Sequence, residues 1–148
     1  RRIASAIVKA REKKTYKTTN DLLTTIEPFF QRAREKKDMA KMFQALRIEV
    51  NHEMDALKEM LTAATELLRS GGRLSVITYH SLEDRICKQI FNSYAKNKDI
   101  PKNLPVLPEE SLSKLKLITR KPICPSEREL EENNRSRSAK LRIAEVQI

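Results

Sequence analysis

The residues best suited to chemistry in this sequence are His80 and Ser81, which directly follow the apolar run 74–79. That run is short and rich in β-branched and aromatic residues, so it predicts a strand that is buried on at least one face. In open α/β sheets, ligands bind beyond the carboxyl ends of parallel strands. The position therefore predicts that His80 and Ser81 line an active site, with His80 as the candidate for a direct catalytic role.

The same two residues also have a purely structural interpretation. The hydroxyl of Ser81 can cap a helix that begins there, with Asp84 three residues further on, and acidic side chains suit the positive end of a helix dipole. His80 would then only form a hydrogen bond to a loop. The residue pattern leaves both interpretations open.

A second candidate group lies on one surface of a predicted helix and comprises Phe43, Gln44, Arg47 and Asn51, at steps of three and four residues. An aromatic ring together with amide and guanidinium groups suits the stacking and edge recognition of an unstacked base. The alternative is that Phe43 belongs to the core and that Arg47 pairs with a neighbouring carboxylate.

The charge of the chain favours a polyanionic partner. The formal net charge is +10, and residues 1–50 hold 13 Lys and Arg against 6 Asp and Glu. A basic surface of this kind is typical of nucleic-acid binding, although a solvated basic face without a ligand would look the same. Further candidates for substrate contacts are Arg85, Arg135, Arg137 and Lys140, with Arg142 beside them. The basic run 135–142 could equally be an edge strand that its charge keeps soluble.

Composition excludes several classes of protein. Hydrophobic residues make up 39% and charged residues 34% of the 148 residues, which is typical of one globular core, alone or with a small appended lobe. The sequence has no apolar run of membrane-spanning length and does not begin with a signal peptide, so we expect a cytoplasmic protein without a membrane partner. The two cysteines, Cys87 and Cys124, have no metal-binding spacing, and we expect no metal site.

The elements that must position these residues can be read from periodicity and end signals. Thr18 and Asp21 predict a capping box, and the Gly71-Gly72 pair is expected to end a long helix. The expected elements are a helix from residue 3 to 14, a helix from 18 to 26, one helix of about 30 residues or two in succession over 39–69, a strand at 73–79, a helix from 81 to 94, a proline-rich loop at 101–108, a strand at 115–120, a short helix at 127–132 that Ser126 caps, and a strand at 139–146. Their order indicates an α/β fold.

Three blocks of sequence resemble one family. They cover residues 43–51 (FQALRIEVN), 71–85 (GGRLSVITYHSLEDR) and 133–142 (NNRSRSAKLR), and shorter matches at 2–8 and 121–126 occur in the same order. In these blocks the chain resembles the 16S rRNA cytosine-N4 methyltransferases, the MraW or RsmH family.

The resemblance implies the C-terminal portion of a class I S-adenosylmethionine-dependent methyltransferase fold, plus part of its inserted helical lobe. Residues 1–40 would be the end of that lobe, and residues 41–148 would be the C-terminal part of the methyltransferase domain. The family holds S-adenosylmethionine on a glycine-rich loop after its first strand, with an acidic residue on the ribose. Neither feature is found in this sequence, so we expect the cofactor in the full-length enzyme and not on this chain, which we interpret as a fragment.

The implied function is transfer of a methyl group to the N4 amine of a cytidine in the decoding region of 16S rRNA, with 16S rRNA or the small ribosomal subunit as partner. The alternative is a basic RNA-binding module that stands alone and lacks catalytic activity. Sequence upstream, with or without a strand and glycine-rich loop, distinguishes the two. We also expect a homo-oligomer, joined through the exposed edge of strand 73–79 or through the long helix.

Overall fold

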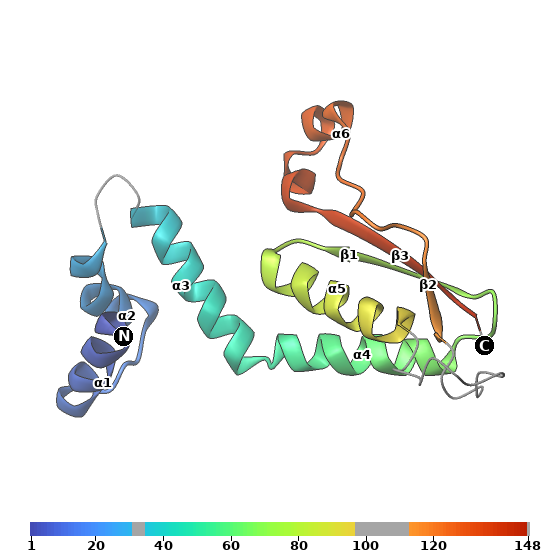
Figure 1. The fold of residues 1–148 in the computed structure, drawn as a ribbon. Helices are drawn as coiled ribbons and strands as arrows, with labels where there is room; N and C mark the ends of the chain where they lie inside the picture. The colour runs from blue at the N-terminus through green and yellow to red at the C-terminus, as the bar shows by residue number, and fades with distance from the viewer. Residues whose placement is uncertain (31–34, 97–112, 148) are drawn as a thin grey trace. The chain divides into compact units, whose positions relative to one another are not determined.

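The computed structural model describes residues 1–30, 35–96 and 113–147. The chain forms two compact units, Arg1–Asn51 and His52–Ile148, and each is described by itself (Figure 1). The unit boundary lies after Asn51, whereas the sequence predicted a lobe that ends near residue 40. The assignment of residues 1–40 to an inserted lobe stays a prediction. The loop predicted at 101–108 lies outside the described residues.

The first unit is helical. It contains α1 (Arg2–Lys13), α2 (Thr19–Ile26), the short 3-10 helix η1 (Glu27–Phe29) and α3 (Glu35–Val50). The predicted capping box is confirmed, because the Thr18 hydroxyl accepts a hydrogen bond from the Asp21 amide at 3.2 Å and the Asp21 carboxylate accepts one from the Thr18 amide at 2.9 Å. Ile26, at the end of α2, is fully buried.

The long apolar stripe forms two helices, α3 and α4 (Glu53–Leu67), one on each side of the unit boundary. Between them His52 adopts a left-handed conformation with φ of 51°. The sequence wrongly predicted that the glycine pair ends the second helix, because α4 stops where Leu68 becomes extended. Gly71, with φ of 78°, instead shapes the turn that leads into the first strand.

The second unit is built on a small antiparallel sheet. Its strands are β1 (Arg73–Thr78), β2 (Leu115–Leu117) and β3 (Lys140–Val146), in the order β1-β3-β2. The C-terminal strands therefore lie on one side of β1, and Val76 is paired with Arg142. The interpretation of the basic run as a solvated edge strand is wrong for β3, which occupies the centre of the sheet.

Two helices cover one face of this sheet. Helix α5 (Ser81–Ala95) packs against β1, β2 and β3, and α4 packs along α5 (Figure 1). The residues buried between these layers are Leu61, Val76, Cys87, Phe91, Leu115, Ala144 and Val146. Alternate residues of β1 point away from the helices, and among them Ile77 is 57% exposed. The mixture of helices and strands agrees with the expected α/β class.

Beyond the sheet, α6 (Glu127–Glu132) and the 3-10 helix η3 (Asn134–Ser138) connect β2 to β3. Ser126 caps α6 as predicted, since its hydroxyl accepts a hydrogen bond from the Glu129 amide at 3.2 Å. Among the helices of the described ranges, none is both long enough and apolar enough to cross a membrane.

Candidate functional site

The junction between β1 and α5 is organised by a histidine cap. His80 has extended backbone angles, and its Nδ1 accepts a hydrogen bond from the Glu83 amide at 3.4 Å. The Glu83 carboxylate in turn accepts hydrogen bonds from the Tyr79 amide at 2.8 Å and the His80 amide at 3.2 Å. His80 and Glu83 thus form the capping box that the sequence analysis assigned to Ser81 and Asp84. Ser81 is the first residue of the helix and is exposed.

This cap determines the orientation of the imidazole ring. Because Nδ1 accepts a hydrogen bond, a neutral ring carries its proton on Nε2. Nε2 is buried and lies 3.1 Å from Oε1 of Glu83, but outside hydrogen-bonding geometry, so it makes no hydrogen bond to any described residue. Both ring nitrogens face Glu83, an arrangement that suits helix capping. A catalytic role for His80 or Ser81 stays a prediction.

Asp84 connects the first turn of α5 to the central strand. Its carboxylate accepts hydrogen bonds from Arg142 Nε at 2.7 Å and Nη2 at 3.3 Å, and from Lys140 Nζ at 3.3 Å. The hydrogen bond from Arg142 lowers the pKa of Asp84 below its usual value of 3.8, against the opposing effect of burial. The carboxylate therefore stays ionised and holds β3 against α5.

The structure corrects the expectation for Arg142, which the sequence placed among phosphate-contacting residues. Arg142 is only 7% exposed and is bound to Asp84, so it is a structural cation. The signal for this was present in the sequence, because Arg142 alternates with Ala144 and Val146 on the buried face of a strand. A charge in that position requires a partner. Lys140, also a predicted substrate residue, is engaged by the same carboxylate but is partly exposed.

Three other predicted cations of this unit point to solvent. Arg85 on α5 and Arg135 and Arg137 on η3 are exposed, and no ion pair to them forms within the described ranges. The η3 turn is held by Asn133, whose Oδ1 accepts from the Arg135 amide at 3.2 Å, and by the buried Ser136, whose hydroxyl donates to the Asn133 carbonyl at 2.8 Å. This turn presents both arginines on the surface.

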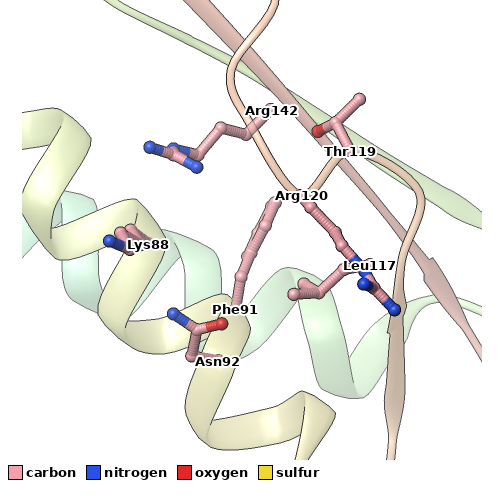
Figure 2. Close-up of a pocket in the computed structure, with 7 residues that line it drawn as sticks. All are labelled: Lys88, Phe91, Asn92, Leu117, Thr119, Arg120 and Arg142. Atoms are coloured by element: carbon pink, nitrogen blue, oxygen red, sulfur yellow. The ribbon is translucent and has the colours of Figure 1, made fainter.

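Arg142 also lines a small hollow between α5 and the sheet (Figure 2). Figure 2 shows Lys88, Phe91 and Asn92 extending from α5 and Arg142 reaching across from β3. The cavity volume is about 30 Å³, which is room for roughly one or two water molecules and far less than a nucleotide requires. This hollow is therefore not a cofactor or nucleotide site.

The remaining predicted residues belong to the first unit. Phe43 and Gln44 are half-buried on α3, Arg47 is exposed on the same helix, and Asn51 is exposed just beyond its end. The Asn51 amide donates a hydrogen bond to the Arg47 carbonyl at 3.0 Å. Three of these residues therefore lie on α3 and the fourth directly follows it, in a different unit from His80.

The two glycines of this chain do not form a cradle of the kind that holds S-adenosylmethionine. The chain has two glycines, and both are used by the turn between α4 and β1. The Gly71 amide donates to the Val146 carbonyl at 2.8 Å. A Cβ on Gly72 would lie 2.8 Å from the Arg69 carbonyl oxygen, so that close approach explains this glycine. Within the described ranges, no three His, Cys, Asp or Glu side chains form a group that could hold a metal ion.

Comparison with known proteins identifies the family. The model of the MraW methylase family matches residues 1–147. The chain belongs to the MraW methylase family. It is 56% identical over 149 aligned positions to a ribosomal RNA small subunit methyltransferase H of Bacteroides thetaiotaomicron. The match covers 98% of this chain and 47% of that methyltransferase, so the MraW-family chain described here spans about half the length of its curated relative.

Proposed function

We propose that this chain is the C-terminal part of a ribosomal RNA small subunit methyltransferase. In this proposal the complete enzyme transfers a methyl group from S-adenosylmethionine to the N4 amine of a cytidine in the decoding region of 16S rRNA. The observation that carries the proposal is the 56% identity to the methyltransferase relative along 98% of the chain. The blocks at 43–51, 71–85 and 133–142, which resemble the family in sequence and in order, add support.

Within that enzyme this chain supplies surfaces that contact RNA and the scaffold that positions them. The exposed Arg85, Arg135 and Arg137 suit contacts to phosphates, which fix the position of an RNA substrate without reading its sequence. The Asp84–Arg142 pair and the His80 cap hold α5 at the end of β1, and this positions Arg85. The two glycines of the chain form no cradle for the cofactor. The proposal therefore assigns no step of methyl transfer to the residues of this chain.

The direct test is a methylation assay with the complete protein, small ribosomal subunits that lack the modification, and isotope-labelled S-adenosylmethionine. We expect label on 16S rRNA and, by mass spectrometry of nuclease fragments, a single added methyl on one cytidine. Label on protein only, or on no macromolecule, would refute the proposed function. The chain of 148 residues serves as a control, and titration calorimetry should detect no stoichiometric binding of S-adenosylmethionine to it.

A variant pair tests the RNA-contacting surface. Arg135→Gln with Arg137→Gln removes two exposed cations from η3, and Lys114→Gln with Lys116→Gln removes two exposed cations elsewhere in the same unit. If η3 contacts phosphates, the first pair should lower the slope of log affinity against log salt by about two and the control pair should leave it nearly unchanged. If the two pairs lower the salt slope equally, the RNA affinity comes from the overall positive charge and not from η3. That result would favour the alternative, a basic RNA-binding module without catalytic activity.

A further inference from the structure

A hollow in the helical unit lies on α1, where none of the predicted site residues is found. It is open to solvent along most of its extent, and its volume of about 440 Å³ is room for a group the size of a single nucleotide. The lining residues are Arg1, Arg2, Ser5, Ala6, Lys9 and Phe29. The lining residues between positions 1 and 9 recur at three- and four-residue spacing, so one face of α1 forms one wall of the hollow. Phe29 of η1 forms the opposite wall.

The lining combines a planar cation with an aromatic ring. The guanidinium of Arg2 lies over the ring of Phe29, with Cζ 5.8 Å from the ring centroid. Phe29 keeps 37% of its surface exposed, although a large apolar side chain gains free energy from burial. Guanidinium planes and aromatic rings are the surfaces on which unpaired bases stack in RNA-binding proteins. The small side chains of Ser5 and Ala6 leave the space that a base would fill.

The charge of the lining is entirely positive. Arg1, Arg2 and Lys9 line the cavity, and no carboxylate does so among the described residues. Lys9 is exposed, and no hydrogen bond or ion pair to its side chain forms within the described part of the chain. A base on the Arg2–Phe29 pair would therefore bring its phosphate within reach of Lys9.

The wall formed by α1 is held in place by its neighbour α2. The Tyr16 hydroxyl donates to the Ile7 carbonyl at 3.4 Å and lies 3.2 Å from the Thr25 hydroxyl, and Lys14 pairs with Asp21 at 2.9 Å. These contacts join the two helices and, through α2, the adjoining η1 that carries Phe29. A surface fixed in this way loses little conformational entropy when a ligand binds.

We propose that this cavity binds one unpaired nucleotide of the RNA substrate, with the base stacked on the Arg2–Phe29 pair and the phosphate held by Lys9. The proposal rests on the proposed function, because it adds a binding site for the RNA of that enzyme. It assigns to α1 and η1 a role in recognising single-stranded RNA that is separate from the phosphate contacts of η3.

The test measures binding of a fluorescent single-stranded RNA of about eight nucleotides to the 148-residue chain by anisotropy, with a duplex of the same length in parallel. Phe29→Leu keeps an apolar side chain but removes the ring. It should weaken binding of the single strand by about five-fold or more, leave binding of the duplex unchanged, and leave the salt slope unaltered. Phe29→Trp should restore the affinity.

Charge variants separate the phosphate contact from general attraction. Lys9→Gln should weaken binding and lower the salt slope by about one, while Arg11→Gln, which removes an equal charge from a different face of α1, should change affinity less than two-fold. The proposal is overturned if Phe29→Leu binds the single strand as wild type does, or if Lys9→Gln and Arg11→Gln act equally.

Two further outcomes keep this proposal separate from the proposed function. In the first, poly-glutamate displaces the single-stranded RNA from wild type and binds the Phe29→Leu variant just as well. That result would assign the hollow to acidic peptides and overturn the nucleotide proposal. Full methylation of 16S rRNA by a complete enzyme that carries the matching Phe-to-Leu change would also overturn it while leaving the methyltransferase assignment intact. Circular dichroism confirms that each variant is folded before binding is compared.

Discussion

The Asp84 carboxylate and the Arg142 guanidinium form a nearly buried ion pair in which Nε lies 2.7 Å from Oδ1, and this pair joins α5 to the middle strand of the sheet. Removing one partner leaves an uncompensated charge in an apolar layer. We predict that Asp84→Ala lowers the free energy of unfolding by about 3 kcal/mol, measured by urea denaturation. The double variant Asp84→Leu with Arg142→Met should recover most of that loss. A single variant that unfolds like wild type would show that the pair contributes little.

The same pair predicts a pH dependence. The folded-state pKa of Asp84 lies below its usual value of 3.8, so the stabilisation is present above that value and is lost as pH falls through the lower, folded-state pKa. We expect the difference in unfolding free energy between wild type and Asp84→Ala to be constant between about pH 5 and 7 and to shrink below about pH 3.8. A difference that grows on acidification would contradict the assigned direction of the shift.

The two interpretations of His80 can be separated by two substitutions. His80→Ala removes the cap and should lower stability by about 1 kcal/mol, whereas His80→Asn supplies another good cap and should unfold nearly as wild type does. In the complete enzyme, a rate of methyl transfer that falls in both variants would assign His80 to the active site. An unaltered rate in His80→Asn would leave capping as its only role.

The thiols differ in environment and should differ in reactivity. Cys87 is fully buried in the core, and this burial raises the pKa of its thiol to about 11, while Cys124 is exposed. We predict that a thiol reagent such as dithionitrobenzoate modifies one cysteine of the native chain rapidly at neutral pH and the second only at the rate of unfolding. Cys124→Ser should abolish the fast phase. Two fast phases would place Cys87 near the surface.

The outer edge of β1 predicts self-association. Within the described ranges β1 has a partner strand on one side, and Ile77 on its uncovered face is 57% exposed. Unpaired backbone groups beside apolar side chains promote pairing with a second chain. We expect light scattering at micromolar concentration to show a dimer and Ile77→Lys to shift it toward monomer, with Lys116→Gln as an unaffected control. A wild-type monomer at all concentrations would contradict this.

Local signals in the sequence were strong enough to predict most elements. The Thr18–Asp21 capping box, the Ser126 cap and the strand predicted at 73–79 each depend on residues close in sequence. The structure confirms all three, with the strand ending one residue earlier, at Thr78. The break between α3 and α4 was harder to place, because neither Gly nor Pro marks positions 51 and 52 and His52 takes a conformation that few residues other than glycine adopt.

Features that depend on distant residues could not be predicted in the same way. The pairing of Asp84 with Arg142 joins residues 58 apart, and only the sheet order reveals that β3 is central. The His80 cap was missed because serine is the commoner capping residue, although Glu83 three residues later fits the pattern equally well. The cavity at Phe29 depends on how η1 lies against α1, which no spacing rule describes. The roles of the candidate site residues stay predictions.

The strand order also constrains how this protein can be made. Because the ribosome produces the chain from its N-terminus, β1 and β2 are both synthesised before the strand that separates and pairs with them. Until residues 140–146 are synthesised, neither β1 nor β2 has a hydrogen-bonded neighbour in this sheet. Arg142, which forms the ion pair with Asp84, is also still missing. Until β3 is made, both strands lack their partner in this sheet and Asp84 lacks its cation, a state in which chaperone binding or aggregation competes with folding.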